Sequence, residues 1–377
     1  MTTIAIDALG TGDSGGPRSA ALNLLRALLA ADPERRYLLF VDQPEPELAG
    51  HGDRVRQIVA PVRHRLLSRV WAQACWPVIL RREGVALVHH LKTVGAFGLP
   101  GRQVYTIYDL TTLRYPQIYP QSDVWFWRYL QPRMLRRADA VVAISQQTAN
   151  DLVSFFGLPS GLLHVIYCTY APGLVPASPA RCEAVRARYG TAEHYVLHVG
   201  SLSRKKNLAT LVHAYEVLRA RGYAGRLVFV GRRYEKGHDP AFWEAIAASP
   251  YRADIVLAGD VPDEDLPPLY TAADVTAFPS LHEGFGIVAI EAMACGCPVV
   301  CSRGGALPEV VGEAGIYVEA SAAPEQWAEA LWPLVSDAGV RAEWRERGLA
   351  WAPRYSAQEA ARRTLALYDQ LLAEGRR

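Results

Sequence analysis

Short apolar segments alternate with helical segments along almost the whole of this 377-residue chain. Many of the apolar segments are rich in Val and Ile, and a stretch compatible with a helix follows most of them. Strands that alternate with helices predict parallel sheets that are covered on both faces, because a parallel connection needs a crossover. We expect strands at residues 3–9, 37–43, 86–91, 103–110 and 140–145, and again at 195–202, 226–232, 254–259, 275–280 and 297–302.

The two groups of strands predict two domains of the doubly wound α/β class, which agrees with the length of the chain. The boundary is expected at Tyr170 to Pro179, where YAPGLVPASP carries no charge and is rich in Pro and Ala. The domains would then be residues 1–170 and 171–355. In the last segment, 356–377, Leu365, Tyr368, Leu371 and Leu372 share a helical face. We expect that helix to pack back on the first domain.

Composition excludes several other classes of protein. With 50% hydrophobic residues and a formal net charge of +2, the chain does not resemble a disordered one. Gly and Pro, with 30 and 25 residues, show no collagen period. The start, MTTIAIDALG, lacks the pattern of a secretory signal, and no run of ~18 uncharged apolar residues occurs. We therefore expect a cytoplasmic protein, and the net charge gives no argument for nucleic-acid binding.

Charge is nevertheless distributed unevenly along the chain. Residues 51–150 carry 14 Lys or Arg against 5 Asp or Glu, whereas the remainder carries 26 against 33. The first domain is therefore expected to face something anionic. Cys295, Cys297 and Cys301 lie close together, but their spacing is not that of a zinc site. We expect buried thiols there and no metal.

The most informative segment runs from His282 to Ala294 and reads HEGFGIVAIEAMA. It follows a predicted strand and is expected to open a helix near Gly286. A helix N-terminus preceded by glycines presents N–H groups and a positive dipole end, which suit a phosphate. Glu283 falls in the loop and Glu291 in the helix, and eight residues at helical rise would be ~12 Å. Two such carboxylates can accept hydrogen bonds from the hydroxyl groups of a sugar and a ribose.

Several motifs resemble those of retaining glycosyltransferases of family 4, which have the GT-B fold. HEGFGIVAIEAMACGCPVV resembles the family's Glu-x7-Glu signature, and His198 to Leu208 resembles its glycine strand end, basic pair and Asn. Residues 258–275 resemble its base-pocket loop, residues 304–315 its diphosphate-side loop, and Gly15-Gly16 its first acceptor-side loop. Because the motifs occur in the family's order over nearly the whole chain, the resemblance is specific.

The resemblance implies a role for individual residues. Glu291 would hold the ribose of a nucleotide-sugar donor, and Glu283 would hold hydroxyl groups of its sugar. Lys206, with Lys205 beside it, would stabilise the charge that develops on the leaving nucleoside diphosphate, in place of a metal ion. No cofactor is expected. The other positions expected at the donor are Gly15, Gly16, Ser201, Val261, Gly284, Phe285, Gly286 and Ile287.

One position departs from the family pattern. Where the family usually has His-Asp, this chain has Tyr108-Asp109 at the end of a predicted strand. The family's His contacts the donor sugar near the reacting carbon, whereas tyrosine keeps a hydroxyl group but never carries a positive charge. His89 or His90, at the end of the preceding strand, is an alternative for this role. A histidine at a strand end is more often structural.

Some of these features also have a plain structural interpretation. Gly15-Gly16 can be a donor contact or simply a strand-to-helix connection. Two lysines at the start of a helix are electrostatically unfavourable unless an anion is present, so Lys205 and Lys206 favour phosphate binding.

Two segments combine Arg with large apolar residues. Residues 63–82 place Leu67, Val70, Trp71, Ala74, Cys75 and Val78 at helical spacing, and residues 125–137 hold Trp125, Phe126, Trp127, Arg128, Arg133, Arg136 and Arg137. Either both segments are helices that pack their apolar faces inward, or one of them lies on an anionic membrane surface.

The resemblance implies two Rossmann-like domains that face each other across a cleft. It also implies retaining transfer of a mannose-like or glucose-like hexose from a GDP- or UDP-linked sugar to a glycan or lipid-linked acceptor in surface polysaccharide synthesis. Two alternatives stay open. Tyr108 would suit a catalytically silent nucleotide-sugar-binding protein, and the fold would also suit a sugar-nucleotide epimerase.

Overall fold

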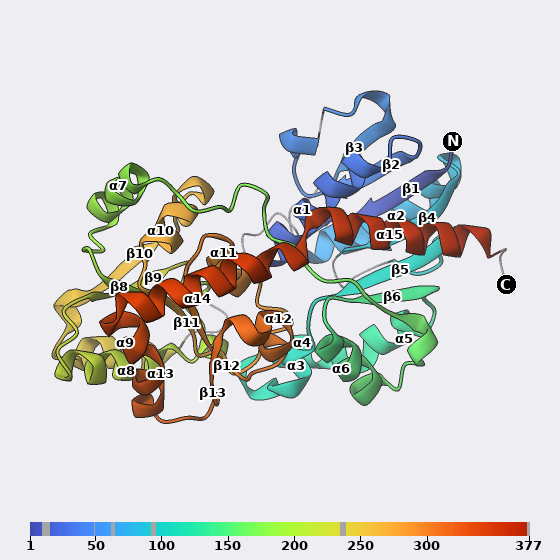
Figure 1. The fold of residues 1–377 in the computed structure, drawn as a ribbon. Coiled ribbons are helices and arrows are strands. Elements are labelled where there is room, and N and C mark those ends of the chain that lie inside the picture. The colour runs from blue at the N-terminus through green and yellow to red at the C-terminus, as the bar shows by residue number, and fades with distance from the viewer. Residues whose placement is uncertain (10–15, 49, 62–64, 92–95, 234–238, 375–377) are drawn as a thin grey trace. The chain divides into compact units, whose positions relative to one another are not determined.

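The computed structural model describes residues 1–377 except 10–15, 49, 62–64, 92–95, 234–238 and 375–377. The chain divides into two compact units. Met1–Pro116, Gln121–Thr169 and Ser356–Arg377 form the first unit, and Gln117–Pro120 and Tyr170–Tyr355 form the second. Each unit contains one parallel sheet with helices packed on it (Figure 1), as the alternating sequence pattern predicts.

The first unit has, within its described residues, a seven-stranded sheet in the order β3-β2-β1-β4-β5-β6-β7. Its elements are β1 (Thr3–Asp7), α1 (Gly16–Ala31), β2 (Arg36–Val41), β3 (Val55–Val59), α2 (Arg65–Arg82), β4 (Val85–His90), β5 (Arg102–Ile107), α3 (Thr111–Arg114), α4 (Gln121–Trp125), η4 (Phe126–Leu130), α5 (Gln131–Leu135), β6 (Ala140–Ala143), α6 (Gln146–Phe156), β7 (Leu163–Val165) and α15 (Ala357–Ala373).

The second unit has a described six-stranded sheet in the order β10-β9-β8-β11-β12-β13. Its elements are α7 (Pro179–Tyr189), β8 (Tyr195–Val199), η6 (Arg204–Lys206), α8 (Leu208–Ala220), β9 (Arg226–Val230), α9 (Pro240–Ala248), β10 (Ile255–Gly259), α10 (Leu266–Ala272), β11 (Val275–Phe278), α11 (Ile287–Ala294), β12 (Val299–Ser302), α12 (Leu307–Val311), β13 (Ile316–Val318), α13 (Pro324–Ser336) and α14 (Ala338–Trp351).

Helices cover both faces of the first sheet. On one face α1 and α15 lie side by side (Figure 1) and share a core with β1, β2 and β4. Tyr368 and Leu371 of α15 are buried in that core, so the apolar stripe of this helix belongs to the first unit. On the other face Trp76 of α2 packs against Phe40 of β2. Burial on both faces explains the nearly continuous apolar sequence of the central strands.

The ten predicted strands are confirmed, with ends that differ by a few residues. Three further strands, β3, β7 and β13, were not predicted. Each lies at an edge of its sheet and is only partly buried. An edge strand has one neighbour and covers less core, so its sequence carries a weaker apolar signal.

Of the two alternatives for residues 63–82, inward packing of the apolar residues listed for this segment is wrong, whereas contact with a membrane stays a prediction. The inward face of α2 is formed by Ala72, Trp76 and Leu80, whereas Leu67 and Val70 are 53% and 65% exposed. Apolar residues at helical spacing occur on two sides of this helix, and the burial of Trp76 decides which side packs inward.

Cys295, Cys297 and Cys301 are buried thiols, as predicted. Burial raises the pKa of the Cys297 thiol to about 12, so it stays protonated at neutral pH. Among the described helices, none combines the length and the apolar composition that a membrane span requires.

Candidate functional site

The basic pair and the glycine-rich motif lie at the carboxyl ends of two neighbouring strands of the second unit. β8 leads through Gly200 into η6, and β11 leads into the loop that holds Glu283. These strands are paired in the sheet although nearly 80 residues separate them in the chain. The strand order reverses between β8 and β11, and open α/β sheets bind ligands at such a point.

Backbone hydrogen bonds connect the loops that form this site. The N–H of Leu281 donates to the carbonyl of Lys205 at 2.8 Å, so the η6 turn is attached to the loop after β11. The N–H of Ala306 donates to the carbonyl of Glu283, also at 2.8 Å. The loop after β12 therefore supports Glu283 from the other side.

Glu283 and Lys206 form a buried ion pair. Lys206 Nζ lies 2.5 Å from Glu283 Oε1, and each residue is 8% exposed. Lys205 Nζ lies 3.7 Å from Oε2 of the same carboxylate. Burial alone would raise the pKa of Glu283, but the two ammonium groups hold it well below its ordinary value. Glu283 is therefore ionised at neutral pH.

The expected helix start at the basic pair is only partly correct. The two lysines lie in the 3-10 turn η6, and α8 begins two residues later at Leu208. The anion that accompanies them in this structure is the carboxylate of Glu283. Binding of a phosphate at the same position remains a prediction.

The helix after the glycine-rich loop begins where the sequence predicts. α11 starts at Ile287, and Gly286 before it has a φ of 91°. A Cβ atom at Gly286 would also lie 2.6 Å from Cδ2 of Leu307, a side-chain end that would have to shift, so the positive φ is the main reason for glycine here. The estimate of eight helical residues between the two carboxylates is wrong. Only Ile287 to Glu291 is helical, a rise of about 6 Å.

Glu291 has the opposite environment to Glu283. It is 8% exposed and accepts one hydrogen bond, from the hydroxyl group of Tyr270 at 3.3 Å. No ion pair to this carboxyl occurs among the described residues. Burial raises the pKa of Glu291 to about 7, which the hydrogen bond from Tyr270 offsets only in part. A buried acceptor with spare capacity is suited to a ligand that donates hydrogen bonds.

The other predicted positions of the second unit surround this pair of loops. Gly284 and Phe285 lie between Glu283 and α11, and the ring of Phe285 packs edge-on against Tyr355 with centroids 5.4 Å apart. Ser201 is half-buried after β8, and its Oγ lies 3.4 Å from Oγ of Ser203. Val261 is half-buried in the loop after β10.

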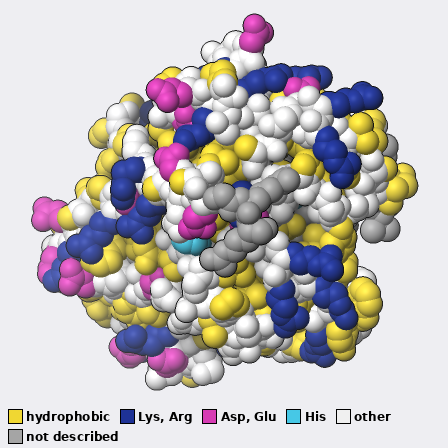
Figure 2. Space-filling model, turned by 90° about the vertical axis from the view of Figure 1, so that its right-hand side faces the viewer, with side chains coloured by type: hydrophobic (Ala, Val, Ile, Leu, Met, Phe, Trp, Pro, Cys, Tyr) yellow, Lys and Arg dark blue, Asp and Glu magenta, His cyan; other side chains and the backbone are white. Residues whose placement is uncertain are grey.

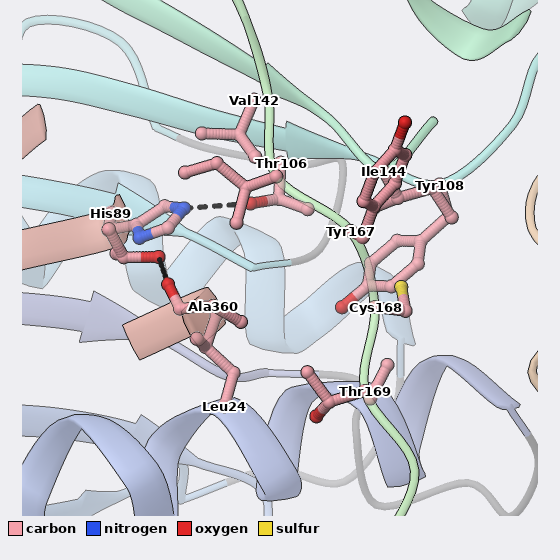
Figure 3. A pocket seen from close by; sticks show the side chains of 13 residues that line it. Leu24, His89, Thr106, Tyr108, Val142, Ile144, Tyr167, Cys168, Thr169 and Ala360 are labelled. Atoms are coloured by element: carbon pink, nitrogen blue, oxygen red, sulfur yellow. Dashed lines mark hydrogen bonds between the residues drawn. The ribbon is translucent and has the colours of Figure 1, made fainter. Parts of the chain in front are cut away.

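Tyr108 and Asp109 belong to the first unit. The ring of Tyr108 lines a cavity of about 30 Å³ beside Cys168 and Thr169 (Figure 3), and burial raises the pKa of its hydroxyl group. Oδ1 of Asp109 accepts a hydrogen bond from the N–H of Thr111 at 3.0 Å, at the start of α3. Whether Tyr108 contacts a donor sugar stays a prediction.

His89 and His90 have structural partners within the first unit. His89 is hydrogen-bonded to Tyr368 and Thr106, and burial lowers its pKa to about 3. His90 lies 3.0 Å from Oδ2 of Asp7. Both imidazoles are completely buried, and His89 also lines the cavity beside Tyr108, so a role of either residue at a donor sugar stays a prediction. Of the predicted loop, Gly15 lies outside the described residues, and Gly16 is the first residue of α1.

His198 begins the motif that resembles the family's glycine strand end, but it was not among the predicted site residues, and the structure places it next to the ion pair. This residue is completely buried in β8, and its ring interacts electrostatically with Lys206 and Glu283. A polar residue inside a strand of apolar ones, two positions before a glycine, is the signal that could have identified it.

Comparisons with known proteins agree with this architecture. Residues 14–172 match the family model described as Glycosyltransferase Family 4, and residues 186–351 match the one described as Glycosyl transferases group 1. O-antigen chain mannosyltransferase B of Escherichia coli is 31% identical over 275 residues, which cover 72% of this chain and 71% of that protein. A D-inositol 3-phosphate glycosyltransferase of Segniliparus rotundus is 34% identical over 328 residues, which cover 83% of this chain and 68% of that protein.

Solved structures show the same fold. HepE of Anabaena, crystallised with UDP and glucose, superposes with a TM-score of 0.77 over 98% of this chain and 100% of its own, at 20% identity. The two doubly wound units are those of the GT-B architecture. From the sheet topology, the family matches and the sequence relatives together, we conclude that this chain is a member of glycosyltransferase family 4.

Proposed function

We propose that the protein transfers mannose, with retention of configuration, from a nucleotide sugar to a glycan or lipid-linked acceptor in surface polysaccharide synthesis. The observation that carries this proposal is the buried Lys206–Glu283 pair at the carboxyl ends of β8 and β11, directly before the start of α11. Similarity to an O-antigen mannosyltransferase supports the sugar and the pathway class. The UDP complex of HepE supports a nucleotide-linked donor.

Lys206, Glu283 and Glu291 each have a task in this proposal. Departure of a nucleoside diphosphate builds negative charge, which Lys206 and the N-terminus of α11 stabilise from fixed positions. Glu283, ionised by its two lysines, accepts hydrogen bonds from hydroxyl groups of the donor sugar. Glu291 accepts them from the ribose. With fixed cations supplying the charge, the proposed mechanism needs no divalent metal.

The direct test is release of nucleoside diphosphate from GDP-mannose, UDP-glucose and UDP-galactose with an undecaprenyl-diphosphate-linked acceptor. We expect turnover with GDP-mannose, an α-linked product by NMR, and a decrease of at least about a hundredfold in kcat for Lys206→Ala. Activity should persist in excess EDTA. Donor binding without release would favour the silent binding protein, and conversion of donor without acceptor would favour the epimerase.

We also propose that the first unit contacts an anionic membrane surface. Trp125 is 59% exposed and Tyr129 46%, and Arg128, Arg133, Arg136 and Arg137 are exposed close by in the chain. The outward face of α2 adds Leu67, Val70 and Val78. Figure 2 shows that Lys and Arg side chains lie among hydrophobic ones on the face that it draws. Aromatic rings beside arginines suit the interface of an anionic bilayer.

Sedimentation with liposomes tests this contact. We expect binding to phosphatidylglycerol vesicles at low salt, weaker binding at high salt, and a severalfold loss in Trp125→Ala and in Arg133→Glu. Arg362→Glu, on the exposed side of α15, is the matched charge control. Failure of the wild type to sediment at low salt would refute the membrane contact.

A further inference from the structure

His198 carries a buried acceptor that the proposed mechanism does not use. Its Nδ1 lies 2.9 Å from the carbonyl oxygen of Ala277 on the neighbouring strand β11. A carbonyl can only accept, so Nδ1 holds the proton and Nε2 keeps its lone pair. Nε2 has no hydrogen-bond partner among the described residues. Burying an acceptor without a partner costs free energy, so this atom requires an explanation.

Nε2 lies near Lys206, on the side of Gly200 where a side chain would stand. A Cβ atom at Gly200 would lie 3.5 Å from His198 Nε2, 3.6 Å from Cε of Lys206 and 3.7 Å from its Nζ. These distances place Nε2 and Nζ on one side of Gly200, and we call the region between these two nitrogens the space at Gly200. The φ of Gly200, 144°, also favours glycine at this position.

The imidazole is held in place and stays neutral. It packs between the rings of Phe229 and Phe278, with centroid distances of 5.9 and 5.8 Å. Burial lowers the pKa of His198 to about 4, and the ammonium group of Lys206 acts in the same direction. At neutral pH the ring is therefore an acceptor that does not repel Lys206.

We propose that His198 is a positioning residue for Lys206, acting through one O–H oxygen in the space at Gly200. That oxygen donates a hydrogen bond to Nε2 of His198 and accepts one from Nζ of Lys206. An ammonium group has three N–H donors. One is used by Glu283 and one by this oxygen, and the third is directed to the donor diphosphate. This inference rests on the proposed function, because it explains how Lys206 is oriented for that task.

A group between these two nitrogens must donate a hydrogen bond to Nε2 and accept one from Nζ. A phosphate oxygen cannot donate to Nε2, so the space accepts a hydroxyl group and not the diphosphate itself. A water molecule and a hydroxyl group of the donor sugar have the required donor and acceptor in common. Nucleoside diphosphates lack the sugar, so comparing them with nucleotide sugars distinguishes the two sources.

Calorimetric titration of the full chain with UDP, GDP, UDP-glucose and GDP-mannose tests the proposal. His198→Phe keeps the ring packing but removes Nε2, and we expect it to raise Kd about tenfold. His198→Gln places an amide oxygen near the position of Nε2 and should stay within about threefold of the wild type. His198→Asn retains a donor for Ala277 but not the reach, and should resemble His198→Phe. Thr276 is buried in β11, and its hydroxyl group is hydrogen-bonded to the thiol of Cys297. Thr276→Val is therefore the control for a hydrogen bond lost elsewhere in the sheet.

Each outcome has a definite meaning. Weaker binding of both ligand types by His198→Phe supports a bridging water, and weaker binding of the nucleotide sugars alone supports a sugar hydroxyl. Wild-type affinity in His198→Phe, or an equal loss in His198→Gln and His198→Phe, would overturn the positioning role. In those two cases Lys206→Ala still weakens binding and the proposed function stands. If neither wild type nor Lys206→Ala binds any of the four ligands, the proposed function fails and this inference with it.

Discussion

Glu283 and Glu291 are equally buried, yet their surroundings shift their pKa values in opposite directions. Glu283 lies close to two ammonium groups, whereas the one hydrogen bond that Glu291 accepts from the described residues comes from the hydroxyl group of Tyr270. An ionised Glu283 stabilises the folded state together with Lys206. An ionised Glu291 is held without a counter-charge, which the unliganded protein tolerates at the expense of stability. This contrast supports the proposed roles, in which Glu283 acts together with Lys206 and Glu291 accepts hydrogen bonds from a ligand.

Replacing Glu291 should therefore stabilise the protein without ligand. With a folded pKa of about 7, above the value of the unfolded chain, Glu291 destabilises the folded state increasingly as pH rises from 4.5 through 7. We expect Glu291→Gln to raise the free energy of unfolding by up to about 3 kcal/mol at pH 8 and by little at pH 4.5. Denaturant titrations at the two pH values measure this. A destabilised Glu291→Gln at pH 8 would contradict it.

Replacing Glu283 should have the opposite effect. Its folded pKa is lowered, so its stabilisation is present above about pH 4.5 and is lost as pH falls toward the folded pKa. Glu283→Gln leaves the Lys206 ammonium buried without a counter-charge, and we expect a loss of about 3–5 kcal/mol at neutral pH. The double variant Glu283→Gln with Lys206→Met should recover much of this loss. If the double variant were no more stable than Glu283→Gln alone, the charges of Glu283 and Lys206 would not be coupled.

At the scale of elements, the sequence was most informative where strands and helices are regular and central. The loop with Glu283 and the helix that starts after Gly286 could be predicted because glycines and an apolar helical segment follow a strand directly. The outward face of α2 could not be predicted, because this helix has apolar residues on two sides and only its packing in the folded unit determines which side is buried. Glu283, which pairs with Lys206, and the carbonyl group of Ala277, which pairs with His198, also come from distant segments of the chain. No local sequence pattern specifies these partners.

The start of α11 provides a test at this scale. Gly286→Ala combines a positive φ with a clash against Leu307, so we expect it to lower the free energy of unfolding by about 1–3 kcal/mol and to weaken nucleotide binding. Adding Leu307→Ala removes the clash but not the backbone strain. Gly98→Ala, with a φ of 70° and open space around it, is the control for strain alone. If Gly286→Ala costs no more than Gly98→Ala, the close packing at this turn is unimportant.

At the scale of the whole molecule, the same strand–helix alternation produces two sheets with the same central order. Each sheet has its first strand in the middle, and in the second unit the reversal of strand order brings the loops after β8 and β11 together. Residues 205–206 and 283–291 thereby become neighbours although they are far apart in sequence. The family resemblance predicted this grouping, whereas periodicity alone predicted only the strands.

We propose above all that the second unit binds a nucleoside diphosphate through Lys206 and Glu291. The most direct measurement is a thermal-shift panel of UDP, GDP, ADP, dTDP and their common sugars on the wild type, Glu291→Ala and Lys206→Ala. Because Glu291→Ala changes the unliganded midpoint, the quantity compared is the shift that each ligand produces. A ligand at 100 times its Kd adds about 2.7 kcal/mol, a shift of a few degrees for a protein of this size. We predict that one nucleotide series shifts the wild type and that both substitutions abolish the shift. A panel in which no nucleotide shifts the wild type, or in which the substitutions leave the shift unchanged, would contradict the claim.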